Sequence, residues 1–288
     1  MGWNPKIQKR AVIITVLALT AIIITGAFVA GLLGALTGLG GGIVIVPLLT
    51  LALGIDIHYA IGASLISVLA TSSGAATVKK GFANIRIGMF LEIAATMGAL
   101  TGTVITAYIA PRWVAIVFGL VMLHSAYMTF TSKKDYLTEK PDRIATFLKM
   151  NGTYPTSDGD YEYHIQSVPW GFFVMYLAGI LSGLLGIGSG ALKVIGMDRI
   201  MRIPFRVSTA TSNFMIGITA AASAGIYLGR GYIEPGLAMP VMLGVFAGSI
   251  TGARLLPVFK VKTLRTIFAL TIVILGIQMM IKGLTGNL

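Results

Sequence analysis

Long apolar segments recur along this chain and leave few ways for it to fold. Each is near or above the roughly 18–20 residues that cross a bilayer as a helix. They occupy residues 11–37, 59–78, 87–109, 113–131, 169–187, 205–228, 235–256 and 265–283. Charged residues make up only 11% of the chain, against roughly 25% in a soluble domain. The pattern predicts an all-α polytopic membrane protein with eight long spans.

The charge of the chain limits its partners. The net charge is +12, and the sequence has no soluble domain to carry a nucleic-acid surface. Basic residues near helix ends are typical of topology signals and lipid-headgroup contacts. We therefore expect contacts with the lipid bilayer and no nucleic acid partner. The absence of cysteine excludes disulfides and thiolate metal sites, and the sequence indicates no metal or cofactor.

The chain reads as a duplication. GLGGG at 38–42 aligns with GIGSG at 186–190, and the same offset places Ala63-Ser64 on Thr211-Ser212. GALTG at 98–102 matches GSITG at 248–252. A short apolar piece follows each glycine cluster, at 42–54 and about 191–203. Such pieces are typical of broken or re-entrant helices, whose exposed backbone groups need protein or water around them.

The predicted organisation follows from this duplication. Residues 1–10 are an N-terminal tail, 11–131 the first transmembrane repeat, 132–168 a polar cytoplasmic linker and 169–288 the second repeat. Each repeat has four to five membrane segments. If the short pieces do not cross, the repeats are parallel; if they do, the repeats are inverted. The distribution of Lys and Arg favours inverted repeats with the N-terminus outside. The end of the linker, DYEYHIQSV, has the alternation of a small hairpin.

The glycine clusters predict an anion site. A helix interrupted inside the membrane exposes N–H groups at the start of its second half, and these donors and the helix dipole favour anions. Two such breaks at a repeat interface resemble the transporter pattern of discontinuous helices around a central substrate. The alternative is that the glycines only allow close helix packing. The residues assigned to substrate binding here are Gly38, Gly40, Gly41, Gly42, Gly186, Gly188, Ser189 and Gly190.

Two charged residues within the apolar segments add to this hypothesis. Lys193, beside the second break, adds positive charge to an anion pocket, or alternatively reaches lipid headgroups. Glu92 is a candidate for carrying a coupling proton, or alternatively pairs with Arg86 near the helix end. Neutral hydrogen-bond donors for the pocket are Ser64, Thr211, Ser212 and Asn213, although serine and threonine also serve as ordinary contacts between membrane helices.

The paired motifs GLGGGIVIVP and GIGSGALKV resemble the sulfite exporter TauE/SafE family of membrane transporters. Ala63-Ser64, TATSNFMIG at 209–217 and GSITGARL at 248–255 share this resemblance. It implies export of sulfur-containing anions such as sulfite or sulfonates across the cytoplasmic membrane of a prokaryote. The second motif departs from the first at Ser189 and Ile195, where the first has Gly41 and Pro47, so the two halves of the site are unequal.

The interpretation that we adopt is a secondary transporter of a small anion and not an enzyme. A cation transporter would need more buried carboxylates, histidines or thiolates. An intramembrane serine hydrolase built on Ser189 would need a base within hydrogen-bond reach, and the histidines lie far away in sequence. A non-transporting scaffold would not require two matched breaks. The oligomeric state stays open, a homodimer included.

Overall fold

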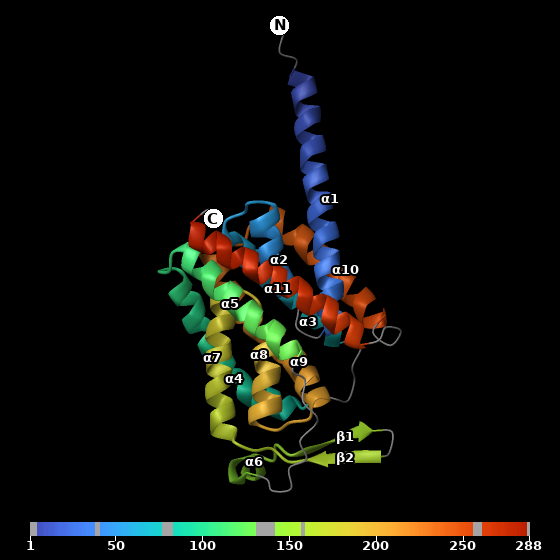
Figure 1. Cartoon of the computed structure of the whole chain (residues 1–288), viewed down its shortest axis with the longest axis vertical. Helices are drawn as coiled ribbons and strands as arrows, with labels where there is room; N and C mark the ends of the chain where they lie inside the picture. Colours follow the sequence, from blue (N-terminus) through green and yellow to red (C-terminus); the bar gives the residue numbers. More distant parts are fainter. Residues whose placement is uncertain are drawn as a thin grey trace.

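The computed structural model describes residues 5–37, 41–76, 83–130, 142–156, 159–255 and 261–286 of the chain. Helices dominate this part, as the all-α prediction required (Figure 1). The first half contains α1 (Pro5–Thr37), α2 (Gly42–Pro47), the π-helix η1 (Leu48–Ala52), α3 (Ile57–Ala76), α4 (Ile85–Thr106) and α5 (Pro111–Phe130). The second half contains α7 (Val168–Leu185), α8 (Gly190–Ile195), the π-helix η2 (Gly196–Ile200), α9 (Phe205–Gly229), α10 (Pro235–Leu255) and α11 (Val261–Thr285).

The linker between the halves is folded and packs against the ends of the helices. It contains α6 (Arg143–Phe147) and the strands β1 (Gly152–Thr156) and β2 (Gly159–Tyr163). The strands pair antiparallel, with Gly152 opposite Tyr163, so the hairpin expected at the end of the linker is present. It lies at the opposite end of the molecule from the start of α1 (Figure 1).

Four helices of the described part are both long and apolar enough to cross a membrane. They cover Leu17–Ala35, Ile85–Thr106, Val168–Leu185 and Pro235–Gly252. Helices α3, α5, α9 and α11 occupy the other four predicted spans, and their crossing stays a prediction. The two predicted short pieces are helices too. In each, an α-helical stretch runs directly into a π-helix, over Gly42–Ala52 and Gly190–Ile200.

Helix α4 illustrates how these helices divide their surfaces. Its large apolar side chains on one face are exposed, which suits contact with lipid: Met89, Ile93, Met97, Leu100 and Val104. Its opposite face is buried and carries small residues together with Glu92. Polar and small residues therefore face the interior, as expected where the surrounding solvent is lipid.

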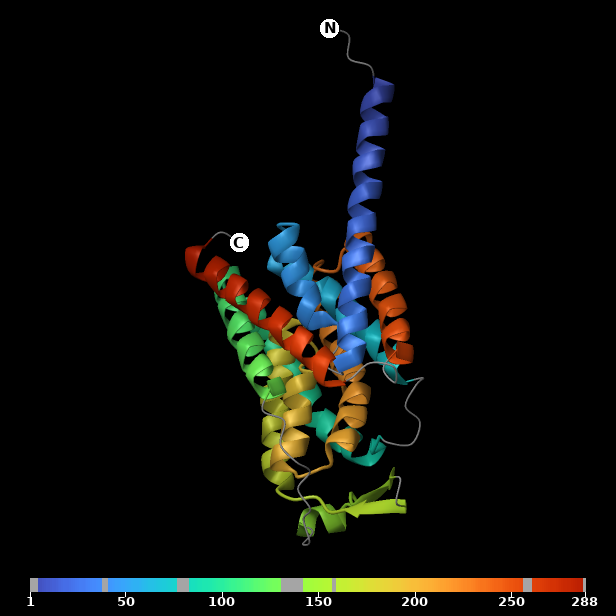
Figure 2. The same cartoon turned by 45° about the vertical axis from the view of Figure 1, so that its right-hand side comes forward.

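Glycines set the closest helix contacts. Helix α1 packs along α10, and α4 packs along α7 (Figures 1 and 2). A Cβ added to Gly98 on α4 would lie 2.1 Å from the Tyr176 carbonyl oxygen on α7. A Cβ added to Gly248 on α10 would lie 2.1 Å from the Phe28 carbonyl oxygen on α1. Both contacts are backbone against backbone, so only glycine allows these distances.

We expect Gly98→Ala to destabilise the protein, because the new methyl group must push α4 away from α7. Overpacking of this kind typically costs about 1–3 kcal/mol, measurable as thermal unfolding in detergent. The matched control is Gly225→Ala on α9, where an added Cβ meets nothing within 4 Å and alanine raises helix propensity by about 1 kcal/mol. Equal melting temperatures for the two variants would show that the α4–α7 contact is looser than described.

Candidate functional site

The two helix breaks lie against each other, although the segments are far apart in sequence. The Ser64 hydroxyl on α3 is 2.8 Å from the Gly186 carbonyl oxygen and 3.2 Å from that of Gly42, so it joins the two breaks. Val68, one turn further along α3, also touches both. Added Cβ atoms at Gly42 and Gly188 would lie 2.6 and 2.9 Å from its two methyl groups. The predicted residues Gly38 and Gly40 lie outside the described part of the chain.

The second break has an unusual backbone. Gly186, Gly188 and Ser189 all have positive φ angles, of 67°, 68° and 46°. Glycine adopts this conformation without steric cost, whereas Ser189 is a non-glycine residue in the left-handed region. The loop reverses the chain so that α8 starts at Gly190, directly beyond the end of α7. Gly41, which precedes α2, has in contrast φ of −69°, in the right-handed helical region.

A second serine bonds the second break. The Ser212 hydroxyl on α9 donates to the Gly190 carbonyl oxygen at 3.2 Å. This bond spans 22 positions, as does the bond from Ser64 to Gly42. The other two predicted donors, Thr211 and Asn213, do not bond the second break in the described part of the chain. Thr211 accepts a hydrogen bond from the Asn84 backbone at 3.0 Å, and Asn213 is half-buried and takes no part in these bonds.

The glycines of the breaks have a packing role as well. A Cβ at Gly42 would lie 2.7 Å from the Ser64 hydroxyl oxygen, and one at Gly188 would lie 2.7 Å from a methyl group of Ile216. Helices α3 and α9 therefore approach the breaks as closely as glycine allows. The glycines of the breaks therefore have the packing role that the alternative interpretation assigned to them.

Both short helices begin at this junction and lead away from it in opposite directions (Figure 1). The first backbone N–H groups of a helix have no partner within that helix, and its N-terminal end carries partial positive charge. Three buried serine hydroxyls also have no hydrogen-bond partner among the described residues: Ser182, Ser189 and Ser223. Ser189 lies in the loop of the second break, and sequence reasoning missed the other two.

Lys193 and Glu92 form an ion pair. The lysine ammonium on α8 lies 3.2 Å from a Glu92 carboxylate oxygen on α4, and both side chains are buried. Thr219 on α9 hydrogen-bonds both partners, and Thr96 donates to Glu92 at 3.1 Å. The cation of Lys193 is therefore compensated and does not reach the lipid headgroups.

The alternative pairing of Glu92 with Arg86 is not formed. Arg86 instead donates to the Lys149 carbonyl oxygen at 2.6 Å. Sequence reasoning also missed Thr219, although a signal for it existed. It lies seven residues, or about two helical turns, beyond Ser212, so the two residues share a face of α9.

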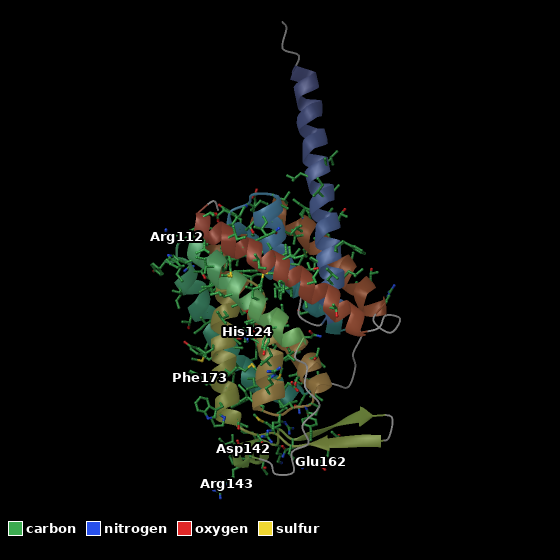
Figure 3. The ribbon with its side chains drawn as sticks, in the orientation of Figure 1. Arg112, His124, Asp142, Arg143, Glu162 and Phe173 are labelled. Atoms are coloured by element: carbon green, nitrogen blue, oxygen red, sulfur yellow. The ribbon has the colours of Figure 1, made fainter. Side chains whose placement is uncertain are left out.

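The geometry required for a serine hydrolase is not formed around Ser189. Its hydroxyl has no hydrogen-bond partner in the described part of the chain, so no histidine contacts it there. His58 instead bonds Asp56 at 3.1 Å. His124 lies along α5, away from the linker (Figure 3). His164 follows directly after β2, within the linker.

A double-mutant cycle tests the energetic weight of the ion pair. Glu92→Gln and Lys193→Met should each lower the free energy of unfolding by about 3–5 kcal/mol, because each leaves one buried charge uncompensated. The double variant should regain most of that loss, since it removes both charges. Chemical unfolding in detergent measures all four proteins. Simple addition of the two single effects would mean that the charges do not interact.

Comparison with known proteins places the chain. It matches the family model "Sulfite exporter TauE/SafE" over residues 22–279. It is 27% identical over 274 residues to the Probable membrane transporter protein YunE of Bacillus subtilis. This alignment covers 91% of the present chain and 98% of YunE. To YdhB of the same organism it is 28% identical over 262 residues, covering 90% and 99%. To a probable membrane transporter protein of Methanocaldococcus jannaschii it is 24% identical over 286 residues, covering 92% and 96%.

No solved structure matches the chain significantly. The family match spans both helix breaks, the serines that bond them and the buried ion pair. It thus includes every residue from which the site was built above. The chain belongs to the sulfite exporter TauE/SafE family of membrane transporters.

Proposed function

We propose that the protein is a secondary transporter that exports a sulfur-containing anion, such as sulfite or a sulfonate, across the cytoplasmic membrane of a prokaryotic cell. The observation that carries this proposal is the meeting of two helix starts at one buried junction, bridged by Ser64. Two positive dipole ends and unpaired backbone donors favour an anion there. The hydroxyl of Ser189 adds a neutral donor. The name of the family supports sulfur oxyanions as the substrate class.

The helix packing supports two inverted repeats around this junction. Helix α1 packs on α10 and α7 packs on α4, so the first helix of each half contacts an equivalent helix of the other. Helix α1 begins at the upper end of the molecule and α7 at the lower end, beside the linker (Figure 1). In this arrangement the linker lies in the cytoplasm and the N-terminus outside, in agreement with the distribution of basic residues. Alternating access would come from one repeat rocking against the other.

The ion pair is proposed to couple a proton to the anion. Protonation of the Glu92 carboxylate would leave a neutral acid and release Lys193 as an uncompensated cation beside the second break. An anion could then take the place of the carboxylate as partner of the ammonium group. Release of both the proton and the anion would restore the original pair, and the charges of the site balance in each state.

Export does not depend on this coupling for its direction. A membrane potential that is negative inside already favours the exit of an anion, by about 2.3 kcal/mol per charge for each 100 mV. A uniporter is therefore energetically sufficient. The coupled proton would change the charge carried per anion and make the flux sensitive to the proton gradient.

Binding of sulfur oxyanions can be measured as thermal stabilisation in detergent, with sulfite, sulfate, thiosulfate, sulfoacetate, taurine and chloride. We expect stabilisation by one of the sulfur anions, and about a tenfold weaker affinity in Ser189→Gly, as one lost hydrogen bond predicts. Ser64→Ala should also weaken the affinity, because it loses the hydroxyl that holds the two breaks together. Ser189→Gly keeps the positive φ accessible. The matched control is Ser73→Ala, on the same helix as Ser64 but exposed. Equal affinities in all variants would exclude the junction as the binding site.

Proton coupling can be tested in proteoliposomes with the membrane potential clamped at zero. Anion efflux from the wild-type protein should rise when the compartment on the linker side is acidified. Glu92 is then protonated more often, and the ion pair with Lys193 is broken more often. The double variant Glu92→Gln/Lys193→Met should not respond to the pH gradient. A wild-type flux that follows the potential but ignores the pH gradient would contradict the coupling role and leave a uniporter.

A further inference from the structure

A second polar site lies where the linker meets the start of α4. A cavity of about 310 Å³ opens there, lined among others by Asn84, Arg86, Lys149, Asn151 and Tyr163. The linker is fastened to the helix beside it, because Arg86 donates to the Lys149 carbonyl oxygen at 2.6 Å. Gly152 keeps the cavity open. A Cβ at this position would lie 2.9 Å from the Tyr163 hydroxyl oxygen and 3.2 Å from the Asn84 amide nitrogen.

The chemistry of the lining favours an anion. It combines a guanidinium, an ammonium and two side-chain amides, and none of its described residues is acidic. The first turn of α4, a helix of 22 residues, faces the same place with Asn84 as its N-cap. Partial positive charge at a helix start adds to that of the two cations. Burial raises the pKa of Tyr163 above its ordinary value, so its hydroxyl is neutral at physiological pH, as an unperturbed tyrosine would also be.

Arg86 and Lys149 line the cavity, whereas other charged residues of the linker lie outside it. Figure 3 shows Asp142, Arg143 and Glu162 at the same end of the molecule. None of these three lines the cavity. Asp142 caps α6 and also accepts a hydrogen bond from the Val168 backbone at 3.2 Å, so it serves the linker fold. Arg143 is exposed on α6 and offers a matched control.

Asn84 connects this cavity to the helix breaks. Its side-chain amide donates to the Tyr163 hydroxyl at 2.8 Å and to the Met150 carbonyl oxygen at 3.1 Å. Its backbone N–H donates to the Thr211 hydroxyl on α9 at 3.0 Å. The next residue of α9, Ser212, bonds the Gly190 carbonyl of the second break. A ligand that shifts Asn84 therefore acts on a helix that contacts the junction.

We propose that this cavity is a separate binding site for a small oxyanion of the phosphate type, and that its occupancy regulates α9. The regulatory part rests on the proposed transport function, whereas binding itself does not. The ligand carries a compact, multiply charged group with several acceptor oxygens, because the cavity places a guanidinium and an ammonium group around a small volume. A free phosphate group and a lipid headgroup on the linker side share this chemistry.

The test is binding of inorganic phosphate to the full chain in neutral detergent, followed by calorimetry and by hydrogen exchange of the amides at 84–87. We expect Lys149→Gln to weaken binding about tenfold, since one charge-assisted bond is lost. Gly152→Ala should weaken it without changing the charge, by filling the cavity. Arg143→Gln should bind phosphate as the wild-type protein does, and so should Ser64→Ala, which affects only the junction.

The outcomes separate this proposal from the transport proposal. Equal phosphate affinity in wild type, Lys149→Gln and Gly152→Ala would overturn the site, as would loss of binding in Ser64→Ala. A second arm uses nanodiscs of phosphatidylcholine with and without phosphatidic acid. Protection of the 84–87 amides by phosphatidic acid without added phosphate would identify a headgroup as the ligand, and protection by phosphate alone a free anion. Absence of protection in both arms would also overturn the site.

Discussion

A helix that breaks inside a hydrocarbon layer leaves backbone groups that only protein or enclosed water can satisfy, and the rest of this structure depends on how that need is met. Here the two breaks lie together, and a single hydroxyl, that of Ser64, is within hydrogen-bond distance of a carbonyl from each. The Ser212 hydroxyl on α9 donates a further hydrogen bond to the second break, at the Gly190 carbonyl oxygen. Helices α3 and α9 must therefore lie beside the junction, and α10 and α4 pack against them.

The positions of the breaks could be predicted from the sequence, because a dense glycine cluster interrupts a helix that the apolar residues around it would otherwise continue. The matched serines could be predicted from the internal offset, and the hairpin from the alternation of DYEYHIQSV. The partner of Lys193 could not. Glu92 lies 101 positions away, and its approach depends on how α4 and α8 are brought together by α9. Local periodicity carries no information on such a distance, so the nearer Arg86 looked equally suitable.

The two halves differ most where charge is involved. At the offsets that align the glycine motifs, Lys193 corresponds to Ile45 and Glu92 to Met242, while Thr219 corresponds to Thr71. The ion pair therefore joins the two halves, with Glu92 from the first and Lys193 from the second, and the equivalent positions carry no second pair. A pair of this kind adds little net stability compared with apolar residues of the same size. A single pair without a symmetry-related counterpart is consistent with the coupling role proposed above.

The glycine contacts have a mechanical consequence. At Gly98 and Gly248 an added Cβ would lie 2.1 Å from a carbonyl oxygen of the facing helix. The two backbones are therefore in direct contact at these positions. Sliding by less than a full turn, about 5.4 Å, would bring side chains into space that only hydrogen atoms can occupy. We therefore expect the helices of each pair, α1 with α10 and α4 with α7, to move together and not to slide along each other. The contact of α3 with α9 lies between these two pairs and has no such backbone contact at a glycine among the described residues, so it is the place where relative movement of the halves would cost least.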